Sequence, residues 1–203
     1  MARIPESVGN AYKRRPKLIS HEQAVATSIA LLEAEGTSGL SMRKLAAGLA
    51  VSLPTVYATI GSREQLVEDL LGQVTAELLD ATAREPRAAE AIVAWIEDRP
   101  WYLDLVRELD LEVRRSVWGS VATQDGRGSV EALRSRLAAE SSAQHELNQL
   151  DATSLLDLLI TSAEFADRLV RAGWTTREKA GATMVDMLAS VLAPGHERVA
   201  AGV

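Results

Sequence analysis

The amino-acid sequence predicts an all-α protein. Apolar residues recur three and four positions apart along nearly the whole chain, which is the spacing of one face of a helix. No sustained alternation of apolar and polar residues indicates a strand. Serine or threonine stands three residues before glutamine or glutamate at several expected helix starts, a spacing typical of the capping box. We therefore expect three short helices, one long helix and a larger helical region, in this order.

The first helix is predicted after Ser20, which can cap it. Its apolar stripe repeats through Val25, Ile29 and Leu32. Gly36 follows the stripe and provides the stop signal.

Two helices of barely two turns are predicted over residues 41–61. Neither is long enough to be stable alone in water, so both are expected to pack against the first helix. The earlier one starts after Ser41 and the later one after Ser52. Pro54 falls in the first turn of the later helix, where backbone N–H groups have no intrahelical partner, so its missing donor costs little. The inward-facing apolar residues are Met42, Leu45, Ala46 and Leu49 in the earlier helix and Val56 and Ile60 in the later one.

The long helix is predicted from its cap at Ser62 to about residue 83, and residues 84–89 mark a break. Residues 119–129 contain three glycines and form the most loop-like stretch of the chain. Thr175 is expected to cap the last helix. The helices after the break are expected around Ile92 to Ile96, from Trp101 in bent form through Val117, and over residues 129–141, 151–172 and 175–193.

Composition limits the classes of protein. The chain of 203 residues contains no cysteine, which excludes disulfides, thiol nucleophiles and cysteine zinc sites. No segment approaches the 18 or so continuous apolar residues of a membrane span, and the N-terminus lacks the apolar core of a secretion signal. We therefore expect a cytoplasmic protein with no membrane partner.

The net charge of −6 hides an asymmetry along the chain. Residues 1–65 hold eight lysines and arginines against five acidic residues, a net charge of +3. The remaining residues hold 14 basic and 23 acidic side chains, a net charge of −9. Only the N-terminal third is suited to a polyanion.

The start of the helix after Ser52 is predicted to be exposed, because Val56 and Ile60 face inward. A helix-turn-helix offers such a helix start to the major groove of DNA. Each nearby cation alone is better explained as a solvated surface residue, but their combination favours contacts with phosphates or guanine. The candidate DNA-binding residues are Ser52, Leu53, Pro54, Thr55, Tyr57, Ala58 and Thr59, with the flanking cations Arg14, Arg15, Lys17, Arg43, Lys44 and Arg63.

A resemblance to a known family is carried by residues 39–70, GLSMRKLAAGLAVSLPTVYATIGSREQLVEDL. This stretch resembles the DNA-binding domain of the TetR family of bacterial one-component repressors, and its GLSMRKLA..L.VS.PT.Y portion is most similar to the tetracycline repressor branch. The resemblance covers roughly residues 18–75. It implies a basic arm over 1–17, a helix-turn-helix DNA-binding domain over 18–65, a helical ligand-binding and dimerisation domain over 66–203, and a homodimer.

The resemblance also assigns roles to single residues. Arg43 matches a base-reading arginine of the family, suited to the O6 and N7 atoms of guanine. Pro54 and Thr55 match contacts to a base methyl group or base edge, and Tyr57 matches a phosphate contact. Arg63 stands where the family usually has a phosphate-binding lysine.

Departures from the family pattern prevent transfer of the operator sequence. Leu53 replaces a polar base reader of the tetracycline branch, and Ala58 and Thr59 replace a large aromatic residue and a histidine. Ala50 stands where the family often has glycine in the turn, which costs about 1 kcal/mol if the backbone is left-handed. Ile60 takes a usual phenylalanine position, which we interpret as repacking of the core.

The helices near 151–172 and 175–193 are the predicted homodimer interface. The first is apolar around more than half its circumference, and Ser162, Ala163 and Ala166 would permit close helix approach. A two-fold four-helix interface would cover such a pair. The alternative is an intramolecular core.

Six of the eight aromatic residues lie beyond residue 90. A small-molecule pocket is mostly apolar with a few polar anchors, so the aromatic residues of this region are candidates for its lining. The alternative is that they are core residues. The candidate ligand-binding residues are Trp95, Trp101, Tyr102, Trp118 and Phe165.

Two classes of function remain open at this point. The favoured one is a ligand-responsive transcriptional repressor that binds a palindromic operator in double-stranded DNA as a homodimer and is released by a small-molecule effector. The alternative is a helical small-molecule carrier or enzyme whose N-terminal motif has lost DNA binding. The sequence shows no acid–base pair, phosphate-binding loop or activated nucleophile, so no catalytic residues are predicted. No metal site and no cofactor are expected either.

Overall fold

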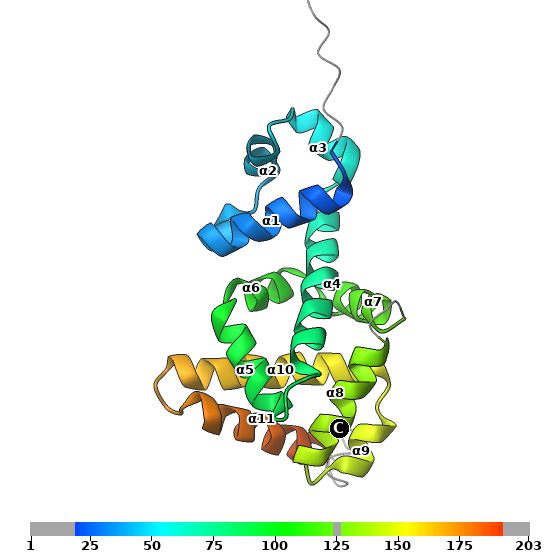
Figure 1. The fold of residues 1–203 in the computed structure, drawn as a ribbon, viewed down its shortest axis with the longest axis vertical. Coiled ribbons are helices and arrows are strands. Elements are labelled where there is room, and N and C mark those ends of the chain that lie inside the picture. The colour runs from blue at the N-terminus through cyan, green and yellow to red at the C-terminus, as the bar shows by residue number, and fades with distance from the viewer. Residues whose placement is uncertain (1–18, 124–126, 193–203) are drawn as a thin grey trace, which may run out of the picture.

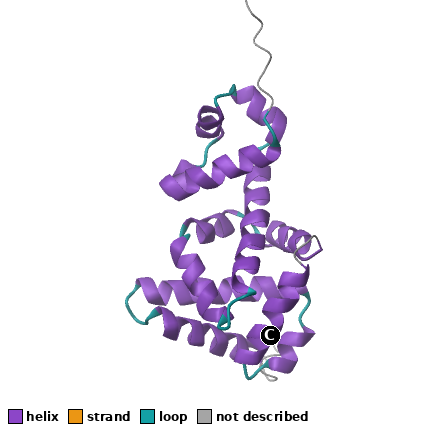
Figure 2. Ribbon diagram, in the orientation of Figure 1, coloured by secondary structure: helices purple, strands orange, loops and turns teal. Residues whose placement is uncertain are grey.

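The computed structural model describes residues 19–123 and 127–192. These residues form eleven α-helices and one 3₁₀ turn, without a strand (Figure 2). The all-α class predicted from the sequence is therefore confirmed. The elements are α1 (His21–Glu35), η1 (Gly36–Gly39), α2 (Met42–Leu49), α3 (Leu53–Ile60), α4 (Arg63–Thr82), α5 (Ala88–Asp98), α6 (Trp101–Glu108), α7 (Leu111–Thr123), α8 (Arg127–Glu140), α9 (Gln144–Gln149), α10 (Ala152–Arg171) and α11 (Arg177–Leu192).

Helices α1, α2 and α3 form a small bundle at one end of the molecule, and α4 leads from it into the larger part formed by α5 to α11 (Figure 1). Leu32 of α1, Leu45 of α2 and Val56 of α3 are fully buried. Burial of these apolar side chains stabilises helices that are too short to be stable alone. Within the described ranges, no helix is long and apolar enough to cross a membrane.

Two predicted capping boxes are formed. The Ser20 hydroxyl accepts a hydrogen bond from the Gln23 backbone N–H at 3.1 Å, and the Gln23 side chain accepts one from the Ser20 N–H. Ser62 and Gln65 make the same pair of bonds at the start of α4. Thr175 was the wrong cap, because α11 begins at Arg177, two residues further on.

Ala50, the residue after α2, has a left-handed backbone with φ 54° and ψ 44°. It is the one non-glycine residue with positive φ in the described segments. Its N–H donates to the carbonyls of Ala46 and Ala47, so the turn closes α2 as a C-cap. The conformation that a glycine would adopt freely is therefore held by an alanine.

Ala50→Gly is expected to raise the free energy of unfolding by about 1 kcal/mol, because it removes the steric cost of the left-handed conformation. Ala50 is exposed, so no packing is lost. The control is Ala47→Gly, an exposed position inside α2, where glycine is expected to cost about 1 kcal/mol. Urea denaturation measures both. Destabilisation by both substitutions would contradict the left-handed conformation assigned to Ala50.

The larger part is built around α4, which packs against α7, while α11 packs against both α5 and α10. Gly181 of α11 lies directly against α5: a Cβ atom there would come within 2.9 Å of the Glu90 backbone. Ser162, Ala163 and Ala166 of α10 are buried within the single chain. The close helix approach that these small residues allow is therefore intramolecular, which agrees with the core alternative for the inner faces of α10 and α11.

The continuous bent helix expected from Trp101 through Val117 is wrong. The chain leaves helical conformation after Glu108, and a new helix, α7, begins at Leu111. The Asp110 carboxylate accepts a hydrogen bond from the Val113 N–H at 2.9 Å, which caps α7.

Helix α9 was also not predicted. It has only six residues, and its one buried side chain is that of Leu147. The guanidinium group of Arg134 on α8 donates hydrogen bonds to the carbonyls of Leu147 and Leu150 at 2.6 and 2.7 Å. A tertiary contact therefore holds this polar segment, and no periodic pattern in the sequence could show it.

Candidate nucleic-acid interface and ligand pocket

The start of α3 is fixed by its own residues. The Ser52 hydroxyl accepts a hydrogen bond from the Thr55 N–H at 3.4 Å, and the two hydroxyl groups lie 2.8 Å apart. Pro54 stands in the first turn. Val56 and Ile60 are buried, as predicted. The opposite face of α3 therefore points away from the bundle.

That outward face carries most of the candidate DNA-binding residues. Tyr57 is 48% exposed, and Ser52, Pro54 and Ala58 are exposed as well. The other three candidates on α3, Leu53, Thr55 and Thr59, are half-buried. Leu53 packs partly against the core, which gives an apolar residue at this position a structural reason.

The flanking cations differ in their surroundings. Arg43 is exposed near the start of α2. The Lys44 ammonium group donates to Glu35 at 2.5 Å and to the Ser38 carbonyl at 3.1 Å. The predicted contacts of Arg14, Arg15 and Lys17 lie outside the described residues.

Arg63, the first residue of α4, forms an ion pair with Glu108, the last residue of α6, at 2.8 Å. The hydrogen bond to Glu108 raises the pKa of Arg63 further above its already high ordinary value. No local pattern in the sequence indicates this pair, because its residues belong to different helices and lie 45 positions apart.

The candidate ligand-binding aromatics are not gathered in one cavity. The rings of Trp95 and Tyr102 meet edge to face with centroids 5.3 Å apart. Trp95 also lines a cavity of about 540 Å³ beside the end of α4. Trp101 lines a different cavity, of about 650 Å³, near the end of α1. Phe165 is 44% exposed on α10 and belongs to the outer surface.

Tyr102 and Trp118 are fully buried. The Tyr102 hydroxyl is hydrogen-bonded to the Thr75 hydroxyl of α4 at 2.9 Å. The Nε1 atom of Trp118 is buried without a hydrogen-bond partner. Burial of an unpaired donor costs about 1–3 kcal/mol, so a ligand that offers an acceptor there would recover this energy.

Above about pH 10, Tyr102 is expected to destabilise the fold. Burial raises the pKa of Tyr102, and the smaller effect of the Thr75 hydrogen bond opposes it. Stability from this group is therefore complete below the unfolded pKa of about 10 and is lost as pH rises toward the folded value.

Tyr102→Phe should remove a decline of about 1.4 kcal/mol per pH unit in the free energy of unfolding above about pH 10. Urea denaturation at about pH 9 and about pH 11 measures this slope. The matched control is Tyr57→Phe, because Tyr57 is exposed on α3. An unchanged slope in Tyr102→Phe would contradict the expected proton linkage.

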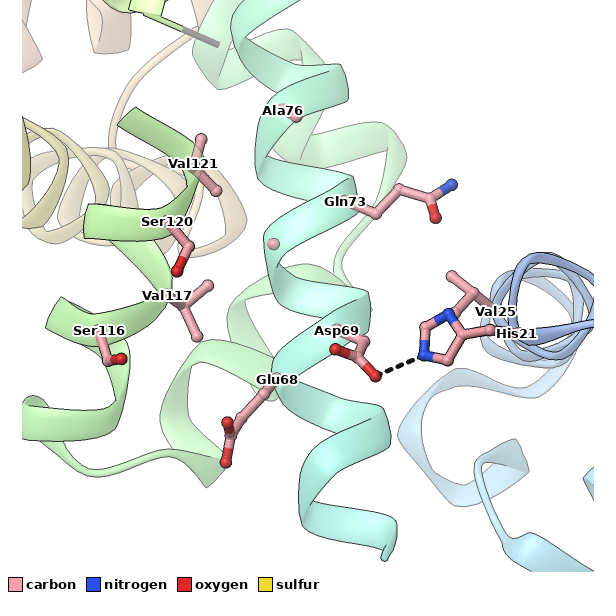
Figure 3. A pocket seen from close by; sticks show the side chains of 11 residues that line it. His21, Val25, Glu68, Asp69, Gln73, Ala76, Ser116, Val117, Ser120 and Val121 are labelled. Atoms are coloured by element: carbon pink, nitrogen blue, oxygen red, sulfur yellow. Dashed lines mark hydrogen bonds and ion pairs between the residues drawn. The ribbon is translucent and has the colours of Figure 1, made fainter. Parts of the chain in front are cut away.

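A further cleft of about 520 Å³ lies between α1, α4 and α7. Figure 3 shows His21 of α1 facing Asp69 of α4, with the serine and valine side chains of α7 on the other side of α4. The Nε2 atom of His21 and the Oδ2 atom of Asp69 lie 2.7 Å apart. No pattern in the sequence indicates this cleft, because its walls come from three helices that are separated along the chain. Among the described residues, no cluster of three or more histidine, aspartate or glutamate side chains is placed to hold a metal ion.

No model of a known protein family matches the sequence, and no curated protein matches it. A solved structure shares the fold. This structure, a TetR family protein from Vibrio parahaemolyticus described as a transcriptional regulator, matches with a TM-score of 0.51 at 19% sequence identity. The match covers 82% of this chain and 97% of that chain. The chain therefore has the fold of a TetR family protein.

Proposed function

We propose that this protein is a ligand-responsive transcriptional repressor of the TetR family that binds a palindromic operator as a homodimer. One observation carries the proposal: α3 buries Val56 and Ile60, while Pro54, Tyr57 and Ala58 are exposed on its other side. A recognition helix needs this division between a face that packs in the bundle and a start that can enter the major groove. The shared fold supports the same assignment.

In this proposal, residues 18–65 bind DNA and residues 66–203 bind the effector and form the dimer. Arg43 reads a base, and Tyr57 and Lys44 bind phosphates. The acidic net charge of the larger part does not oppose this function, because only the small bundle meets the polyanion. A repressor acts where the DNA is, so we infer a cytoplasmic location.

The outer faces of α10 and α11 are the proposed dimer interface. Phe165 and Val191 are exposed there, although both are large apolar residues. Leu158 and Leu169 of α10 are half-buried. They stand seven residues before and four residues after Phe165, a spacing that places all three on one side of the helix. A two-fold interface would cover this apolar surface and would place two copies of α3 about 34–36 Å apart, one turn of DNA.

The effector is proposed to bind near Trp118 and Tyr102 in the larger part. The unpaired Trp118 N–H offers a polar anchor in an apolar surrounding. The Tyr102 hydroxyl is hydrogen-bonded to the Thr75 hydroxyl of α4, the helix that leads to the DNA-binding bundle. A ligand that displaces Tyr102 would therefore act on α4, and effector and operator would weaken each other's binding reciprocally.

Selection of bound sequences from a random pool of DNA duplexes tests the proposal. The expected result is enrichment of a two-fold symmetric sequence whose half-sites lie about one helical turn apart. Binding of the selected duplex should fall steeply as salt is raised. Equal and weak binding of all sequences would reject the repressor and favour the carrier or enzyme alternative.

A further inference from the structure

The pair formed by Arg63 and Glu108 joins the DNA-binding bundle to the larger part. Arg63 is the residue after the cap of α4, three positions after the end of α3. Glu108 ends α6, which also packs against α4 and against η1 of the bundle. The Glu108 carboxylate of the larger part is therefore paired with the Arg63 guanidinium group at the proposed DNA surface.

A carboxylate and a phosphate bind a guanidinium group through the same N–H donors. Because the Arg63–Glu108 bond uses the NH1 atom, a DNA phosphate must either displace Glu108 or share the guanidinium group with a second negative charge. Both groups are partly exposed, with 39% and 30% of the side-chain surface accessible. Solvent and a DNA phosphate can therefore reach Arg63, which allows a phosphate to replace Glu108 as its partner.

Lys44 provides a contrast on the same surface. Its carboxylate partner, Glu35, ends α1 of the same three-helix bundle. A shift of the larger part leaves that pair unchanged. The Arg63 pair depends on where α6 ends.

We propose that Glu108 competes with a DNA phosphate for Arg63, so that the position of α6 sets how much Arg63 contributes to operator binding. This inference rests on the proposed function. Exposed ion pairs are weak, so the competition adjusts DNA affinity by a modest factor and does not switch it fully. A ligand that moves α6 away from α4 would separate Glu108 from Arg63 and leave Arg63 available to a phosphate. A ligand that holds α6 in place would keep the Arg63–Glu108 pair intact.

Operator affinity of Glu108→Gln, measured by fluorescence anisotropy against salt concentration, tests the proposal. The substitution keeps the side-chain size and removes the charge. We expect affinity about 2- to 5-fold tighter than wild type at low salt, and a salt dependence steeper by about one unit of log–log slope, because one more phosphate is neutralised. In an Arg63→Ala background, the same substitution should change affinity less than about 2-fold.

The matched control is Glu112→Gln, which removes an equal charge from an exposed position in the first turn of α7. It should leave both affinity and slope close to wild type. Glu108→Asp keeps the charge but shortens the reach, so a competitor should give an intermediate affinity. Weaker binding by Glu108→Gln, or an equal gain in the Arg63→Ala background, would overturn the competition. Failure of the wild-type protein to bind any selected duplex would instead reject the proposed function, and this inference with it.

Discussion

Phe165→Asp is expected to separate the proposed homodimer into monomers. Phe165 is exposed on α10, so the substitution leaves the chain's own core intact. An aromatic residue at the centre of an interface typically contributes about 2 kcal/mol or more, and a two-fold interface contains two copies. We therefore expect the dimer dissociation constant to rise by a factor on the order of 1,000. Analytical ultracentrifugation over a range of concentrations measures it.

Operator affinity should fall when dimerisation is lost, because each monomer can contact only one half-site. Leu111→Asp is the matched control: Leu111 is also an exposed apolar residue, but it lies at the start of α7. This control should remain a dimer and bind the operator. If Phe165→Asp remained dimeric at micromolar concentration, the outer faces of α10 and α11 would not be the interface.

Arg43→Ala is expected to weaken operator binding by about 1–3 kcal/mol, or roughly 5- to 150-fold. A bidentate contact from arginine to guanine discriminates against the other bases, so the loss should be accompanied by relaxed preference at one position of each half-site. Arg43 is exposed on α2, so the fold should not change. Repeating the selection with the variant measures the preference directly.

The control for this substitution is Arg115→Ala, which removes the same charge from an exposed position on α7. It should lower affinity little and leave the preferred sequence unchanged. A loss in Arg43→Ala that is uniform across all operator sequences would show that Arg43 binds phosphate and does not read a base.

Local signals in the sequence predicted the small bundle well. Ser20, Ser62 and Pro54 each act through neighbours within a few residues, and the structure has the corresponding caps and helix start. The inward direction of Val56 follows from helical spacing alone and is confirmed by its complete burial. Such features could be predicted because local hydrogen bonds and periodicity determine them.

Tertiary contacts determined what the sequence did not show. The end of α6 depends on Asp110 capping the next helix, and α9 depends on Arg134 of α8. The aromatic residues share a region of the sequence but not a surface, because Phe165 faces outward while Trp118 faces the core. Partners such as Glu108 for Arg63 could not be predicted, since neither residue has a local pattern that identifies the other.

The contact between Gly181 and Glu90 restricts which substitutions the chain can accumulate over time. Hydrogen is the only substituent that fits at position 181, since a methyl group there would push against main-chain atoms of α5 and not against a movable side chain. A larger side chain at this position would push α5 and α11 apart. Glu90 and Gly181 line one cavity together with Glu178 and Val185 of α11, so the width of this cavity depends on one residue that has no side chain of its own.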